Sequence, residues 1–422
     1  MGFEKEAGSS SHSIPRPRED TPLLGKKPSH QSSQIKTFAN IFLAVVGSGV
    51  LGLPYTFMKS GWLFGLLTLF TAAFLTYYSM ILLVHTRRKL DSLNGFSKIT
   101  SFGDLGFAVC GPIGRVAVDV MIILSQAGFC ISYLIFIGHT LAHLLNRSYS
   151  FEILGLSPKS WYIWGCFPFQ LGLNSIAKLT HLAPLSIFAD FVQIVSMGVV
   201  MGKDVSVFLK NRPALNAFGG WNVVFYCVGV CVYAFEGIGM TLPLESEAED
   251  KEKFGMTLGL SMGFISLLYG AFGTLGYLAF GDQTSDIITI NIGTGLLSTL
   301  VQVGLCINLF FSLPLMMNPV YEVVERRLAS GSYCLWLRWV MVLGISVVAL
   351  VVPNFADFLS LVGSSVCIAL GFVLPAWFHM LVHKAEMGRG GLLLDGAIVG
   401  LGVLLGVSGT WTALMEMSQG LN

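Results

Sequence analysis

Long apolar stretches alternate with short polar connections along this chain, after a polar N-terminal segment. The apolar stretches cover residues 35–58, 61–86, 113–144, 160–179, 182–203, 221–243, 256–280, 293–325, 334–352, 355–384 and 392–415. About 20 apolar residues are enough for a helix to cross a bilayer. The pattern therefore predicts an all-α integral membrane protein with eleven transmembrane helices.

The composition narrows the class of protein further. Of the 422 residues, 54% are hydrophobic and 12% are charged, whereas soluble domains are about 25% charged. No basic stripe with interleaved aromatic residues is present, so no nucleic acid is expected as a partner. The eight cysteines lack zinc-ligand spacing with histidines. We see no HExxH motif, no nucleophile beside a histidine and no pair of acids within a span. We therefore expect neither an enzyme nor a metal site or other cofactor, and the surroundings should be membrane lipids.

The basic residues predict an orientation. When the spans alternate, most of the 25 Lys and Arg residues fall on the same side as the N-terminus, and basic loops mark the cytosolic side. We expect a cytosolic N-terminus and, with an odd number of spans, a C-terminus on the far side. The sequon Asn146-Arg147-Ser148 would then lie in a non-cytosolic loop, which makes Asn146 a glycosylation candidate, although chance accounts for such a triplet equally well.

Residues 1–34 are rich in Ser, Pro and basic side chains and poor in apolar ones. This composition predicts a disordered cytosolic tail. Within it, Glu19, Leu23 and Leu24 match the spacing of an acidic dileucine sorting signal. Such a signal would make an adaptor complex a partner of the tail, although so short a pattern also arises by chance.

The first apolar stretch contains Gly47-Ser48-Gly49-Val50-Leu51-Gly52-Leu53-Pro54. The pattern GxGxxG within it lacks the preceding strand and following acid of a dinucleotide site. Glycine costs a helix about 1 kcal/mol and proline about 3 kcal/mol relative to alanine. We expect residues 47–52 to be unwound and to line a cavity, since freed backbone groups in a bilayer need protein or water. A kink packed by small residues is the alternative.

The sixth apolar stretch carries a second interruption, Phe235-Glu236-Gly237-Ile238-Gly239-Met240-Thr241-Leu242-Pro243. Paired interruptions at corresponding positions of two halves indicate the binding site of an inverted-repeat transporter. Exposed N–H groups at a half-helix start attract a carboxylate, and exposed carbonyls attract an ammonium group. An amino acid presents both groups, and it is the substrate class that this pattern favours.

With these residues the chain resembles the amino acid/auxin permease family of the amino acid–polyamine–cation superfamily. The resemblance rests on the glycines and Leu-Pro of residues 47–54 and on Ala234-Phe235-Glu236-Gly237, and it covers nearly all of residues 35–412. Among family members, the chain is most similar to the plant vacuolar neutral amino-acid transporters. The resemblance implies a LeuT-like 5+5 inverted repeat with broken first and sixth helices plus one extra helix, and amino-acid movement coupled to protons. The repeats would span 35–205 and 206–385, and 386–422 would hold the eleventh helix and a non-cytosolic C-terminus.

Glu236 is the acid at the centre of a broken span, and a carboxylate at that depth is a functional-site hypothesis by default. It is the candidate for proton coupling, or else a permanent acceptor for the unwound backbone. The expected substrate-binding residues are Gly47, Ser48, Gly49, Val50, Phe235, Glu236, Gly237, Gln126, Tyr133, Asn308 and Ser312. Polar residues within spans also serve as contacts between helices, and we expect Asp119 and Asp190 to make such contacts or contacts of a cytosolic gate rather than to couple protons. The acids from Glu245 to Glu252 are expected in a solvated loop.

No Lys or Arg lies in the middle of a span, and the glycines leave little bulk in the expected pocket. These features favour small neutral amino acids such as Ala, Pro, Gly and Ser. Together with the resemblance, they predict a proton-coupled secondary transporter that exports such amino acids from the vacuole lumen across the vacuolar membrane to the cytosol. The alternative is a nutrient sensor of the same fold that binds amino acids and signals through its tail or loops.

Overall fold

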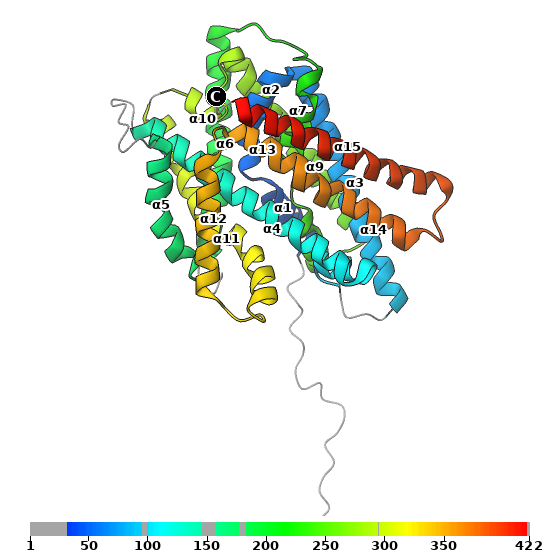
Figure 1. Cartoon of the computed structure of the whole chain (residues 1–422). Coiled ribbons are helices and arrows are strands. Elements are labelled where there is room, and N and C mark those ends of the chain that lie inside the picture. The colour runs from blue at the N-terminus through cyan, green and yellow to red at the C-terminus, as the bar shows by residue number, and fades with distance from the viewer. Residues whose placement is uncertain (1–31, 95–98, 146–156, 177–182, 294, 420–422) are drawn as a thin grey trace, which may run out of the picture.

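The computed structural model describes residues 32–94, 99–145, 157–176, 183–293 and 295–419, and these form a helical bundle (Figure 1). The helices in chain order are α1 (Gln34–Val45), η1 (Ser48–Gly52), α2 (Leu53–Ser60), α3 (Trp62–Asn94), α4 (Phe102–Leu145), α5 (Pro158–Asn174), α6 (Ala183–Asn211), η3 (Trp221–Val223), α7 (Val224–Ala234), η4 (Ile238–Met240), α8 (Thr241–Glu247), α9 (Phe254–Phe280), η5 (Gly281–Gln283), α10 (Ile288–Asn291), α11 (Leu296–Leu328), α12 (Leu335–Val351), α13 (Phe355–Val362), η6 (Gly363–Cys367), η7 (Ala369–Val373), α14 (Leu374–His383) and α15 (Arg389–Gln419). The expected all-helical class is confirmed.

The helices that are clearly long and apolar enough to cross a bilayer are fewer than the eleven predicted. In the described chain, eight helices are long and apolar enough to cross a bilayer, and the bent pair α1–α2 makes nine. The helices α5 and α12 have 17 residues each, which is the lower limit for a span. Eleven spans would require both short helices to cross as well, so length and apolarity alone do not confirm the predicted count.

Both predicted interruptions occur, with more local order than expected. In the first, Val46 and Gly47 are extended, and Ser48–Gly52 then forms a short 3₁₀-helix rather than a fully unwound segment. The chain bends by 52° between α1 and the helix that follows. In the second, the α-helix stops at Ala234 and a 3₁₀ turn over Ile238–Met240 leads into α8. Each Leu-Pro pair lies in the first turn of the next helix, where proline removes no helical hydrogen bond.

Two sets of helices form the body of the bundle. The first comprises α4, α5, α11 and α12, which pack on one another, and α5 and α12 lie side by side in Figure 1. The second comprises the broken elements α1–α2 and α7–α8 with α3 and α9. Helix α6 contacts α11 of the first set and α9 of the second. The last helix, α15, runs along the outside against α13 and α14 (Figure 1).

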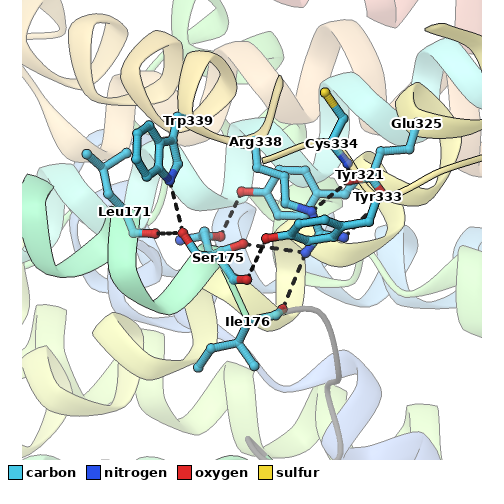
Figure 2. A network of polar contacts seen from close by, with 10 residues as sticks. Leu171, Ser175, Ile176, Tyr321, Glu325, Tyr333, Cys334, Arg338 and Trp339 are labelled. Atoms are coloured by element: carbon cyan, nitrogen blue, oxygen red, sulfur yellow. Dashed lines mark hydrogen bonds and ion pairs between the residues drawn. The ribbon is translucent and has the colours of Figure 1, made fainter. Parts of the chain in front are cut away.

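A buried arginine joins three helices of the first set (Figure 2). The Arg338 guanidinium donates to both carboxylate oxygens of Glu325, at 2.8 and 3.2 Å, and lies between the rings of Tyr321 and Tyr333. It also donates to the carbonyl of Ile176, just beyond the end of α5. A cation that closes the free carbonyls at a helix end is favourable there. The ends of α5 and α11 are thereby fixed to the start of α12.

Candidate functional site

A cavity of about 650 Å³ lies where the two broken elements meet α4, α6 and α11. We call the side of the bundle on which α1 begins the tail side. The exposed lining residues, such as Met240, Glu322 and Arg326, come from segments on this side. The deepest lining residues are buried, among them Tyr133 and Tyr233. The cavity therefore extends from the breaks toward the tail side.

The glycines of the first break have different surroundings. A Cβ on Gly49 would lie 2.7 Å from the Cα of Ala234, so the absence of a side chain lets the two breaks touch. A Cβ on Gly47 would meet nothing within 4 Å, and Gly47 lines the cavity. Gly47 thus forms part of the cavity wall, as expected for an unwound segment. Gly49, two residues later, provides the close packing of small residues that the alternative interpretation predicted.

Side chains from other helices reach the carbonyls that the first break frees. The Tyr269 hydroxyl donates to the carbonyl of Val45 at 3.2 Å, and the Gln193 amide makes a long contact of 3.5 Å to the carbonyl of Gly47. Gln193 in turn accepts from Asn308 at 3.0 Å, and Asn308 accepts from Ser312 at 3.0 Å. This row of polar side chains connects α11 through α6 to the break. It supplies the partners that unwound backbone requires inside a bilayer.

Glu236 is half-buried and faces the cavity from the second break. Its carboxylate accepts a hydrogen bond from the backbone N–H of Ile238, and its own N–H donates to the carbonyl of Tyr233 at 3.2 Å. Among the described residues, no basic side chain forms an ion pair with it. The carboxylate is therefore available to a ligand as well as to the backbone.

Nine of the eleven residues expected to bind substrate line this cavity. They are Gly47, Ser48, Gly49, Gln126, Tyr133, Glu236, Gly237, Asn308 and Ser312. Val50 and Phe235 are fully buried and do not line it. Val50 lies in the 3₁₀ turn, and the Phe235 ring packs against Tyr269 with centroids 5.3 Å apart. The sequence analysis did not select Gln193, which also lines the cavity. Gln193 follows Asp190 by three residues, so the two side chains share one face of α6.

At the tail side, the cavity is bordered by charged residues. Asp119 of α4, itself buried, accepts from Arg326 at 3.0 Å and from Arg327 at 2.8 Å, both on the last turn of α11. Both arginine side chains are about 40% exposed, at 41% and 39%. Arg115 and Asp104 form a further pair at 3.2 Å. The interpretation of Asp119 as an inter-helix or gate contact agrees with this geometry.

The opposite side carries a different charged cluster, which does not line the cavity. Lys59 at the end of α2 lies 2.8 Å from Glu416 of α15 and 3.6 Å from Asp357 of α13. The Tyr226 hydroxyl of α7 donates to Asp357 at 3.0 Å, and the Lys59 ammonium lies over the Tyr226 ring. Asp357 is buried. The cluster joins four helices across the end that the cavity does not reach.

The expectation of a fully solvated acidic loop after the second break is wrong for Glu245. This side chain is completely buried on α8 and forms ion pairs with Arg87 and Arg88 of α3. Asp250, by contrast, lies in the loop and accepts from the backbone N–H of Glu252 and Lys253. Its hydrogen bonds with Lys253 lower the pKa of Asp250. The sequence did not distinguish Glu245 from Asp250, because five acids lie within eight residues. In the structure α8 continues to Glu247, so Glu245 belongs to the helix and Asp250 to the loop.

Some expectations cannot be compared with the structure. The sorting motif at Glu19, Leu23 and Leu24 and the sequon at Asn146 lie outside the described residues.

All eight cysteines are free thiols. In the part of the chain that the structure describes, no three His, Cys, Asp or Glu side chains are grouped as a metal site requires.

Comparison with known proteins now decides the family. The family model described as "Transmembrane amino acid transporter protein" matches residues 30–415. The chain belongs to this family of transmembrane amino acid transporters. It is similar to amino acid transporter AVT3A of Arabidopsis thaliana, with 63% identity over 99% of each chain. It is also similar to vacuolar amino acid transporter 3 of Saccharomyces cerevisiae, with 27% identity over 94% of this chain and 58% of that protein. The relatives are named as transporters, which places this chain in a non-enzyme family.

A solved structure shows the same fold. The inward-facing conformation of Mhp1 aligns with a TM-score of 0.56 over 93% of this chain and 90% of that chain, at 13% sequence identity. Mhp1 has the LeuT-like fold that the family resemblance implied. The family and the fold are thereby established, and the cavity at the two breaks is the candidate site for the amino acid.

Proposed function

We propose that this protein is a proton-coupled carrier of small neutral amino acids that moves them from the vacuole lumen to the cytosol. The observation that carries the proposal is the cavity at the two breaks, which contains free backbone, Glu236 and no basic side chain at its deep end. The tail side would be cytosolic and the opposite side lumenal. Relatives named vacuolar amino acid transporters support the location, and the two sets of five helices, 35–205 and 206–385, would form the inverted repeat.

The wall of the cavity supports a preference for small zwitterions. Gly47, Gly49 and Gly237 line it with backbone, so the α-amino and carboxylate groups can approach carbonyl and N–H groups directly. The arginines that line the cavity lie at its tail-side mouth rather than beside Glu236. A neutral substrate side chain needs no charged partner, whereas an acidic one would lack a cation next to Glu236.

Glu236 is the residue through which we propose that the proton couples to transport. A carboxylate without a basic partner is costly to keep charged away from water. Binding of a proton offsets that cost and leaves a neutral carboxyl group that can donate a hydrogen bond to the substrate carboxylate. Protonation of Glu236 would therefore favour substrate binding, and the substrate and proton affinities become positively linked.

The test uses purified protein in proteoliposomes. An acidic interior should accelerate efflux of pre-loaded alanine relative to equal pH on both sides. Glu236→Gln should remove this acceleration while alanine exchange continues, because glutamine keeps the acceptor oxygen but cannot ionise. A matched control is Glu322→Gln, an exposed acid that lines the cavity's mouth, which should retain the acceleration. An unchanged pH response in Glu236→Gln would assign the proton to another group.

The sensor alternative rests on one contact. The backbone N–H of Ser32 donates to the carbonyl of Glu247 at 2.9 Å, and Glu249 donates back to the carbonyl of Ser32 at 3.2 Å. This bridge connects the end of the tail to the segment after α8, which follows the second break. Removal of residues 1–31 should leave transport intact in a carrier. Loss of a cytosolic partner with transport unaffected would favour a signalling role for the tail.

A further inference from the structure

One buried acid outside the cavity has no part in the proposed function. Asp204 lies on α6, seven residues before the helix ends at Asn211, on the side opposite the tail. Its side chain is fully buried, and neither carboxylate oxygen has a hydrogen-bond partner in the described structure. Native proteins leave few buried polar atoms unpaired, and each exception requires an explanation.

In the part of the chain that the structure describes, no counter-charge is paired with Asp204. The helices that contact α6 most extensively are α9 and α11. Along its whole length α9 offers only Tyr269 and Tyr277 as titratable groups, and α11 offers only Cys306 before Tyr321 near its tail-side end. On α6 itself, the nearest cation is Lys203, which donates to Ser298 at 2.8 Å. No ion pair of Asp204 is seen in the described residues.

This environment accepts a neutral carboxylic acid far more readily than a carboxylate. Burial of an ionised carboxylate without a partner costs many times more than burial of the neutral acid. The conformation described here, in which Asp204 is buried without a partner, thus favours the protonated form of that side chain.

Asp204 is also placed where its charge would affect the site. It is eleven residues after Gln193, and eleven residues turn an α-helix through three turns plus about 20°. The two side chains therefore lie on one face of α6, together with Ala189, Met197 and Val200, all of them buried. Gln193 contacts Asn308 and the carbonyl of Gly47. Movement of α6 near Asp204 would be transmitted along a rigid helix to the first break.

We propose that Asp204 is a lumenal pH sensor that permits the lumenal side to close only when it is protonated. In the lumen-open form the side chain contacts water and equilibrates with the lumen. An acidic lumen protonates it, and the neutral acid can be buried as α6 packs on α9 and α11. At neutral pH the carboxylate resists burial and the carrier stays open to the lumen. The proton returns to the lumen when that side reopens, so this step regulates the cycle without driving it.

This inference depends on the proposed orientation but not on coupling through Glu236. The experiment is therefore alanine exchange across proteoliposomes at equal pH inside and outside, stepped from about pH 5 to about pH 8. Above the pKa of a group its neutral fraction falls about tenfold per pH unit, so wild-type exchange should fall by about tenfold or more over the range. Asp204→Asn, which is neutral at every pH, should lose the part of this fall that Asp204 causes, so its rate should decline less than that of wild type and exceed it at pH 8.

Asp282→Asn serves as the matched control, since Asp282 is an exposed acid on the same side of the bundle. It should keep the wild-type pH profile. If Asp204→Asn does not fold, Asp204→Ala gives the same reading, because alanine is also neutral and leaves no unpaired polar atom. A wild-type pH profile in the neutral variant, or pH-independent exchange in the wild type, would overturn the inference. Failure of the proposed function would appear separately, as efflux that a pH gradient does not accelerate.

Discussion

The two ends of the cavity are built from different interactions. At the tail side, the arginines that hold Asp119 are about 40% exposed, at 41% and 39%, and the cavity extends between them and the breaks. At the opposite side, the buried side chains of Phe355 and Leu359 pack against Gly52 of the first break, and the Lys59 cluster joins α2, α7, α13 and α15. The molecule is therefore closed on one side and accessible on the other.

The difference in burial also predicts which contacts are easily exchanged. Exposed ion pairs contribute about 0–1 kcal/mol, whereas loss of one partner from a buried pair costs about 3–5 kcal/mol. Exchange of one exposed arginine at the tail-side mouth of the cavity thus costs little, although buried ion pairs of Glu245 and Glu325 hold other helices at that side. Opening of the Lys59 cluster at the opposite side needs a larger driving force. In a carrier that exposes its site alternately, binding of substrate and proton on the lumenal side would supply that force.

The largest effect should come from the contact between the two breaks. In Gly49→Ala, the new methyl group would lie 2.7 Å from the backbone of Ala234, so the broken helices must separate beneath the closed side. We expect transport to fall at least about 100-fold, as overpacking costs about 1–3 kcal/mol and misplaces the site as well. Alanine uptake into proteoliposomes measures this loss.

Gly47→Ala is the matched control for that substitution, because its Cβ would meet nothing within 4 Å. It should retain transport of glycine and lose more activity toward larger substrates, since the methyl group enters the cavity. Equal loss in both variants would show that the contact with Ala234 is not what distinguishes the two glycines.

The second effect concerns the closed side. Lys59→Met removes the cation from Asp357, which is buried, and from Glu416. Lys59 itself is 18% exposed, so we expect a loss of folding free energy near the lower end of the range for buried pairs, about 3 kcal/mol. Thermal unfolding in detergent measures it. Lys210→Met, an exposed lysine on the same side, should leave the unfolding temperature unchanged, and an equal drop in both variants would contradict the role of the cluster.

Much of this comparison could be predicted from the sequence, and the missing part has a physical cause. Glycines and prolines inside apolar stretches revealed both breaks, because helix propensity and backbone satisfaction in lipid are local properties. The burial of Glu245, the contact of Gln193 with Gly47 and the isolation of Asp204 depend on which helix packs opposite. Such pairings follow from tertiary packing, and one sequence does not specify them.

The smallest effect should come from the exposed arginines of the tail side. Arg326→Gln leaves Asp119 paired with Arg327 at 2.8 Å, so we expect a change of about 0.5–1 kcal/mol in stability and a modest change in transport rate. Arg327→Gln should behave alike, since Arg326 then remains at 3.0 Å. The double variant should lose more than the sum of the two, because Asp119 would be left buried without a cation. A double-mutant cycle on thermal stability measures the excess, and strict additivity would show that the two arginines do not share Asp119 as a common partner.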